Sequence, residues 1–286
     1  KLREKYLKKL VKFSGNGLEK AFLMSAGTEA TEAAFKLMRM YGKKNNKRKL
    51  GVLCFEGNWH GRTMASQMMS GDKKQSEWIG YHDKNIHHIA FPYPWKTNEE
   101  SAEQFLEKSL RNLNRKLNLK KDICGIMIET FQGWGAIFYP KKYIQLLAKI
   151  CKRNNILIAF DEMQAGFGRT GKNFGFEHYG IKPDLICCGK GMGGGIALSG
   201  VIGKKKIMDL PDIGNMSSTN SANPIACSAG LAVIEEIEKK KLTNRSKNLG
   251  ILLHKDLNKI SKKYSNLFQV YGKGLIASMV FDEKNS

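Results

Sequence analysis

Short apolar runs alternate with helical patterns along most of the chain. Runs of β-branched and aliphatic residues, such as ILIAFDE at 156–162 and DLICCGK at 184–190, are typical of strands buried on both faces. Between such runs, apolar residues recur at intervals of three and four, as in the segment that follows Thr28. This alternation predicts a doubly wound α/β domain with a mostly parallel sheet sandwiched by helices.

The same patterns predict where the elements lie. Strands are expected at 18–25, 50–56, 86–91, 123–129, 156–162, 184–190 and 199–204, the last returning antiparallel or at an edge of the sheet. Helices are expected at 1–13, from Thr28 to about 42, briefly after 57–63, at 99–117, at 141–152, and from about 223 through 237. Residues 130–140 are expected to form a loop.

The composition changes after Lys241, which divides the chain into two predicted domains. Residues 1–241 form a large α/β domain, and 242–286 begin a smaller α+β domain with a helix and two apolar runs separated by glycines. The chain has no initiator Met, starts inside an amphipathic helical pattern and ends just after a strand pattern. We therefore expect it to be a fragment that lacks some functional residues.

Charge and cysteine content restrict the class of protein only slightly. The formal net charge is +22, but the lysines are scattered over loops and helix faces without a zinc-finger, RNP-like or basic-heptad pattern, so no nucleic-acid partner is expected. No apolar run is long enough to span a bilayer, and no signal-peptide pattern is present. Six cysteines without CxxC spacing predict reduced thiols in a soluble, cytoplasmic protein.

Two charged residues end apolar runs and are the strongest candidates for chemistry. Asp161 ends the first run quoted above and Lys190 ends the second, so both are expected at the carboxyl ends of neighbouring parallel strands. A lysine whose pKa is lowered can attack an aldehyde. Pyridoxal phosphate needs such a lysine, an acid for its ring nitrogen and a phosphate cradle. The alternatives are a surface lysine at a strand end and a helix-capping acid.

The turn before the first long helix supplies the third component. Gly27 and Thr28 stand where free backbone N–H groups at a helix N-terminus bind phosphate. The competing interpretation is an ordinary helix with Thr28 as its N-cap. After the second strand, Trp59 could stack on a flat cofactor and His60 could donate to it, although a core tryptophan and a structural histidine are also compatible with the pattern.

Other cofactor sites fit the sequence less well. Glycines surround Lys190 at 189, 191 and 193–195, which favours close approach to a ligand. Lys190 is followed by Gly191 and Met192, so no P-loop is formed, and no dinucleotide fingerprint is present. The histidines at 82, 87 and 88 lack complementary ligand spacing, so no metal site is expected.

Four separated motifs, in order, resemble the class III pyridoxal-phosphate aminotransferases, the group that contains the ornithine, acetylornithine and 4-aminobutyrate enzymes. They are SAGTEATEAA at 25–34, WHGRT at 59–63, the segment 161–195, and STNSANPIA at 218–226. The resemblance covers residues from about 18 to 234. It implies a fold-type I domain, a homodimer with active sites at the subunit interface, and ping-pong amino transfer.

The resemblance also implies roles for individual residues. Lys190 is similar to the Schiff-base lysine and Asp161 to the partner of the pyridine nitrogen. The remaining cofactor-binding residues implied are Gln164 at the phenolic oxygen, Met163 and Trp59 at the ring faces, His60 near the cofactor, Gly27 and Thr28 at the phosphate, and Thr219 reaching the phosphate in the neighbouring subunit.

Two positions depart from the family pattern and bear on the substrate. Glu129-Thr130 stands where the family has Glu-Pro, and Trp134 replaces an acidic residue that helps manage a substrate-binding arginine in the ornithine and 4-aminobutyrate enzymes. Glu129 and Trp134 are therefore candidate substrate-binding residues, and ornithine and 4-aminobutyrate are disfavoured. The family's carboxylate-binding arginine would lie beyond Ser286.

Together these features predict an aminotransferase that moves an amino group from an amine or amino-acid donor to an oxo acid or aldehyde. An aminomutase, racemase or decarboxylase is the alternative, because the lysine, aspartate and phosphate turn are common to those enzymes. A binding protein on the same scaffold is disfavoured, since every central catalytic position is filled.

Overall fold

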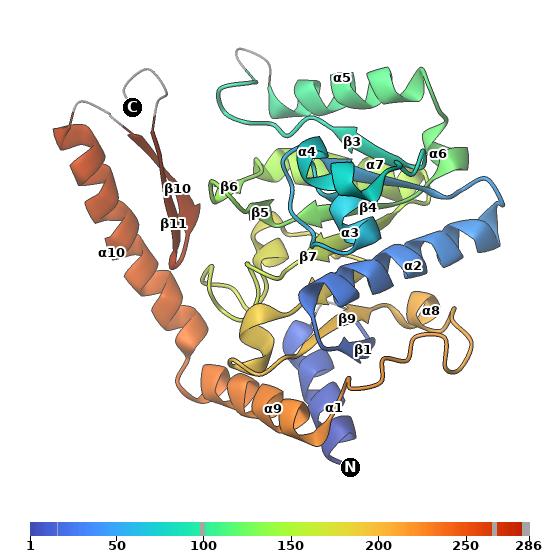
Figure 1. The fold of residues 1–286 in the computed structure, drawn as a ribbon. Helices are drawn as coiled ribbons and strands as arrows, with labels where there is room; N and C mark the ends of the chain where they lie inside the picture. Colours follow the sequence, from blue (N-terminus) through green and yellow to red (C-terminus); the bar gives the residue numbers. More distant parts are fainter. Residues whose placement is uncertain (16, 98–100, 265–267, 282–286) are drawn as a thin grey trace.

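A seven-stranded, mostly parallel sheet forms the centre of the molecule (Figure 1). The computed structural model describes residues 1–15, 17–97, 101–264 and 268–281. Across the sheet the strands are ordered β1 (Lys20–Met24), β9 (Ser199–Gly203), β8 (Leu185–Cys188), β7 (Leu157–Asp161), β4 (Ile123–Glu129), β2 (Gly51–Phe55) and β3 (Ile86–Ile89). Strand β9 runs antiparallel to β1 and β8 on either side of it, and the other six strands of this sheet share one direction, so their carboxyl ends lie at the same edge.

Helices cover both faces of this sheet. They are α1 (Leu2–Ser14), α2 (Gly27–Asn45), α3 (Met64–Met69), α4 (Lys73–Ser76), α5 (Ala102–Asn114), α6 (Leu119–Asp122), α7 (Lys141–Arg153), α8 (Lys205–Met208) and α9 (Pro224–Lys239). Alternate residues of each strand enter different cores: Met127 and Ala159 pack with α2, whereas Ile128 and Phe160 pack with α1, α7 and α9. The central strands are buried on both faces, as their continuous apolar runs predict.

The predicted α/β architecture and the predicted strands are confirmed, with one correction. Residues 199–204 were expected to return antiparallel or at an edge, and β9 is antiparallel, lying between β1 and β8. The expected loop at 130–140 contains a short antiparallel hairpin, β5 (Phe131–Gln132) and β6 (Ile137–Phe138). Two-residue strands are too short to give a periodic signal. Residues 99 and 100 of one predicted helix lie outside the described residues.

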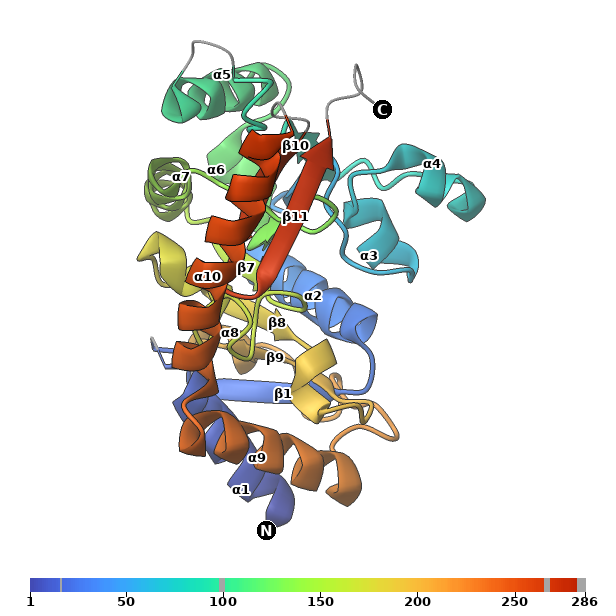
Figure 2. The ribbon, with the colours of Figure 1, turned by 90° about the vertical axis from the view of Figure 1, so that its left-hand side faces the viewer.

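The C-terminal part of the chain forms its own layer. Helix α10 (Leu242–Lys263) packs against a separate hairpin, β10 (Phe268–Lys273) and β11 (Ile276–Phe281), and both stand beside the carboxyl-end edge of the main sheet (Figures 1 and 2). The preceding Lys241 has a φ of 49°, and the chain changes direction there. The domain boundary at Lys241 stays a prediction.

Two expectations drawn from composition meet the structure here. All six cysteines are buried and free. Within the described residues, no helix combines the length and apolar character needed to cross a membrane.

Candidate active site

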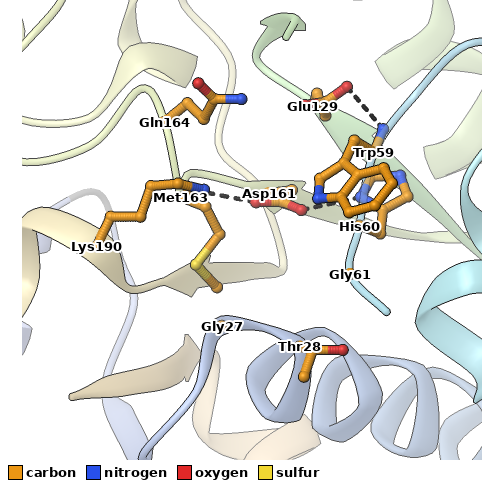
Figure 3. A pocket seen from close by; sticks show the side chains of 10 residues that line it. All are labelled: Gly27, Thr28, Trp59, His60, Gly61, Glu129, Asp161, Met163, Gln164 and Lys190. Atoms are coloured by element: carbon orange, nitrogen blue, oxygen red, sulfur yellow. Dashed lines mark hydrogen bonds and ion pairs between the residues drawn. The ribbon is translucent and has the colours of Figure 1, made fainter. Parts of the chain in front are cut away.

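A pocket opens where the carboxyl ends of β4, β7 and β8 meet the N-terminus of α2 (Figure 3). In register, Glu129 of β4 lies opposite Asp161 of β7, and Asp161 lies opposite Cys187 of β8. The lining residues are Gly27, Thr28, Trp59, His60, Gly61, Glu129, Asp161, Met163, Gln164 and Lys190. The pocket therefore brings together nine of the eleven residues singled out from the sequence; Trp134 and Thr219 do not line it.

Asp161 is the most firmly held charged group of this pocket. Its side chain is buried, with one oxygen 2.9 Å from His60 Nδ1 and the other accepting the Met163 backbone N–H at 3.0 Å. The chain turns after Asp161 and does not begin an α-helix, so the helix-capping interpretation of this aspartate is wrong. A carboxylate fixed by two donors points in one direction without reorganising when a ligand arrives.

Two other carboxyl groups nearby lie in low-dielectric surroundings. Burial, followed by the charge of Asp161, raises the pKa of Glu129 well above its ordinary value, and its carboxyl accepts the Trp59 backbone N–H at 3.0 Å. Burial also raises the pKa of Glu162 to about 7. Glu162 accepts hydrogen bonds from the Thr130 hydroxyl and the backbone N–H groups of Gly175 and Phe176, and so anchors the turn beyond the pocket.

Lys190 follows β8 by two residues and adopts a left-handed backbone conformation. Its φ is 45°, a region that non-glycine residues rarely occupy and that is associated with functional sites. It begins a short 3₁₀ turn, Lys190–Gly193, and its side chain lines the pocket while remaining solvent-accessible. Within the described residues its ammonium forms no ion pair.

Met163 enters the pocket because two neighbouring residues lack side chains. A Cβ on Gly27 would lie 2.9 Å from Met163 Sδ, and a Cβ on Gly189 would lie 2.6 Å from it. On the other side of the pocket, a Cβ on Gly133 would lie 2.7 Å from Gln164 Nε2. These glycines hold the walls close together, a role that the spacing around Lys190 indicated only in general terms.

The N-terminus of α2 is organised by Glu29. Its carboxylate accepts the backbone N–H groups of Ser25 and Ala26 at 2.8 and 2.7 Å, and the helix begins at Gly27 with Ala26 as its N-cap. The alternative in which Thr28 caps the helix is therefore wrong. The Thr28 hydroxyl instead lies 2.6 Å from the Thr63 hydroxyl, at the side of the pocket.

Gly61 is a lining residue that the sequence interpretation did not select. Its φ is +140°, and a Cβ there would lie 2.3 Å from Thr28 Oγ1. Only glycine combines that conformation with that approach. The available signal was the position of this glycine directly after Trp59 and His60, in the turn that faces the helix N-terminus.

An aromatic group lies outside the pocket lining. Trp134 is 58% exposed and donates through Nε1 to the Tyr93 hydroxyl at 3.2 Å, while Tyr93 stacks on Trp95 at 4.8 Å between ring centroids.

Two further predicted site residues differ in burial. Trp59 is half-buried in the pocket wall, with the Arg62 guanidinium 4.7 Å from its ring. Thr219 is exposed in a turn before α9.

Comparison with known proteins gives a consistent result. The model of the class III aminotransferase family matches residues 1–286. The chain is 31% identical to acetylornithine aminotransferase of Nitrosomonas europaea and 36% identical to the 5-aminovalerate aminotransferase of Pseudomonas putida, over 91% and 93% of this chain. It spans only 63% and 61% of the length of these two relatives.

Solved structures agree in fold. An aminotransferase of Bacillus anthracis superimposes with a TM-score of 0.88 at 26% identity, covering 100% of this chain and 66% of its own. A transaminase from an uncultivated Pseudomonas species, solved with pyridoxal phosphate bound, gives a TM-score of 0.88 at 25% identity. The match covers 100% of this chain and 68% of the transaminase chain. The four motifs, the parallel sheet with its pocket at the carboxyl ends, and these matches agree: the chain belongs to the class III aminotransferase family.

Proposed function

We propose that this chain carries the cofactor site of a pyridoxal-phosphate-dependent aminotransferase, which moves an amino group from an amine or amino-acid donor to an oxo acid or aldehyde by a ping-pong mechanism. One observation carries the proposal. Asp161 and Lys190, delivered by the adjacent parallel strands β7 and β8, line the same pocket as the N-terminus of α2. The solved transaminase with bound pyridoxal phosphate supports the choice of cofactor.

The residues of the pocket fit this cofactor. Lys190 offers an amine, Asp161 a buried carboxylate for the ring nitrogen, and Gly27 with Thr28 the helix N-terminus and hydroxyl for the phosphate. Met163, Trp59 and Gln164 would bound the ring, and His60 would hold Asp161 in place. When bound, pyridoxal phosphate supplies an aldehyde carbon and a ring that accepts electrons.

The chain's own residues then have separate tasks. Asp161, fixed by His60 and by the Met163 N–H, would keep a proton on the ring nitrogen of the bound cofactor. Lys190 would hold the cofactor at its aldehyde carbon, and its Nζ, once free, would be the group that carries a proton from the donor Cα. Glu129, whose raised pKa favours the neutral acid, is the candidate for the substrate side of the pocket.

Further parts of the proposal concern the whole protein. We place Trp134 at the mouth of the pocket, where it would contact substrate, and Thr219 at a homodimer interface, where it would reach the partner's cofactor. The exposure of both side chains supports these positions. The separate hairpin beyond Lys241 supports a large domain at 1–241 and the start of a second domain at 242–286. The free cysteines support a cytoplasmic location.

Absorption spectroscopy tests the function directly. Pyridoxal phosphate added to the full-length protein should produce a visible band that is absent from Lys190→Ala, and a donor amine should remove the band while an oxo product accumulates. A parent protein without the band would refute the cofactor assignment. If the band is lost but the product is a decarboxylated, racemised or rearranged donor, the protein is a decarboxylase, racemase or aminomutase and not an aminotransferase.

A further inference from the structure

A second and larger hollow lies at the opposite ends of β7 and β8. This basic cleft has a volume of about 710 Å³. It lies between the C-terminal part of α7, the C-terminal part of α2, and α8, and the latter two are on the right-hand side of Figure 1. Its lining residues are Tyr41, Gln145, Ala148, Lys149, Lys152, Asn155, Ile156, Leu157, Ile158, Gly180, Ile181, Lys182, Asp184, Lys204 and Lys206.

The charges around the basic cleft are unbalanced. Among the described residues that line the cleft, Asp184 is the one acidic residue, and it pairs with Lys204 at 2.7 Å and accepts the Ile158 backbone N–H at 2.9 Å. The other four lining lysines form no ion pair or side-chain hydrogen bond within the described residues: Lys149, Lys152, Lys182 and Lys206. One cleft therefore presents four uncompensated ammonium groups from three separate segments of the chain.

Apolar residues also line the basic cleft. Ile156, Leu157 and Ile158 are buried, with their side chains in the cores on opposite faces of the sheet, and Ile181 is half-buried. At one side the Tyr41 hydroxyl donates to Asn155 Oδ1 at 2.5 Å, and this contact fixes an aromatic ring and an amide at the wall. This group of lysines therefore borders a concave site that is also lined by apolar residues.

We propose that the basic cleft binds a small ligand that joins a flat apolar body to a chain of phosphates, of the nucleoside triphosphate class. Ammonium groups from three segments of the chain would neutralise the phosphates, and the half-buried Tyr41 and Ile181 would contact the base. A nucleic acid strand needs a continuous basic groove that tracks its backbone, and the four unpaired lysines grouped around one hollow favour a compact ligand instead. The proposal is independent of the amino-transfer chemistry.

Calorimetric titration of the full-length protein with ATP tests this site, with pyridoxal phosphate saturating so that the first pocket is filled. The double variant Lys152→Glu/Lys182→Glu should raise the Kd for ATP about tenfold, since two exposed attractions become repulsions. The matched control is Lys255→Glu/Lys262→Glu on α10. It changes the net charge by the same amount, but on an exposed helix at the opposite side of the molecule in Figure 1. It should leave the Kd within about twofold of the parent value.

A second measurement does not depend on the variants folding. ATP should protect Lys149, Lys182 and Lys206 from acetylation in the parent protein, as followed by mass spectrometry, while Lys255 stays reactive. Equal loss of affinity in both double variants, or protection spread over the whole surface, would overturn the site. Inorganic triphosphate binding as tightly as ATP would overturn the apolar part of the assignment, and displacement of ATP by an RNA oligonucleotide at lower concentration would overturn the preference for a compact ligand.

Discussion

The two ends of strands β7 and β8 carry opposite kinds of site. At the carboxyl ends, a pocket of about 200 Å³ holds carboxyl groups that are buried and hydrogen-bonded, such as Asp161 and Glu129. At the amino ends, a cleft of about 710 Å³ is bordered by exposed lysines that, apart from Lys204, have no partner among the residues that the structure describes. The same two strands thus position a preorganised site and a solvated one.

The difference shows where geometry has been fixed in advance. The two carboxyl groups at the carboxyl end, Asp161 and Glu129, are oriented by backbone N–H groups and a buried histidine, so they need little reorganisation when a ligand binds. At the amino end the charges are free to move, so attraction there is long-range and sensitive to salt. Substitutions at the carboxyl end should therefore change chemistry strongly, whereas those at the amino end should change affinity mildly.

The largest effect is expected for Lys190→Ala. It should lower amino transfer by at least about 10⁴-fold, because the nucleophile and the proton carrier are removed together. Steady-state turnover with a donor and an oxo acid measures this loss. Lys255→Ala on α10 is the matched control and should retain parental turnover. Equal losses of turnover in the two variants would show that Lys190 matters no more for amino transfer than an exposed lysine on α10.

Asp161 and His60 should act as one unit. Asp161→Asn should lower turnover by about 10³-fold, because a neutral amide does not hold a proton on the ring nitrogen. His60→Ala should lower it by about 10²-fold, the size of effect typical when the partner that orients a functional group is lost.

A double-mutant cycle separates positioning by His60 from a direct role. If His60 acts through Asp161, the double variant should be no slower than Asp161→Asn alone. Turnover numbers and the pH profile of the His60→Ala variant provide the measurement. Strictly additive losses would mean that the 2.9 Å contact between the two side chains does not carry the effect of His60.

Substituting one glycine at each site compares the rigidity of the two ends of β7 and β8. Gly61→Ala should lower the free energy of unfolding by about 3 kcal/mol, because its φ of +140° is restricted to glycine and Thr28 Oγ1 occupies the position of the new methyl. Gly180→Ala at the basic cleft should cost about 1 kcal/mol, because its φ of +67° is left-handed but a Cβ there would lie 3.8 Å from Gln145 Nε2, an ordinary contact distance. Urea unfolding of both variants measures the difference, and equal costs would contradict it.

The buried carboxyl of Glu162 should make stability depend on pH. Its pKa is raised from 4.5 to about 7, so the folded state holds more protons than the unfolded chain between these values, and the stability that Glu162 contributes falls as pH rises through this window. The free energy of unfolding of Glu162→Gln should therefore rise, relative to that of the parent, by up to about 3 kcal/mol as pH increases from 4.5 to 7. Urea unfolding at several pH values tests this, and a constant difference between the two proteins would contradict it.

Apolar patterning predicted the sheet well because its strands are buried on both faces. The runs that contain β4, β7 and β8 are continuous, and such runs mark buried parallel strands. The hairpin β5–β6 and the interior position of β9 were not predictable, since two-residue strands have no period and strand order depends on contacts distant in sequence.

The candidate site was predictable where a side chain carries the chemistry. Asp161 and Lys190 stood out because charge rarely ends an apolar run, whereas Gly61 acts through the absence of a side chain and leaves no chemical signal. The contact between His60 and Asp161 joins residues 101 positions apart, which only the folded chain reveals. The basic cleft was not predicted, because lysines are frequent along the whole sequence and those that line the cleft do not form a distinct pattern in it.

The smallest effect is expected at Trp134, which tests how far the preorganised region extends. This residue is 58% exposed and lies beyond the pocket lining, so its packing on Tyr93 constrains it less than burial constrains Asp161. Trp134→Ala should raise the donor KM about threefold and leave kcat unchanged, as expected for an aromatic contact that is the same in ground and transition states. A fall in kcat of the size expected for His60→Ala would extend the preorganised pocket to the aromatic residues around its mouth.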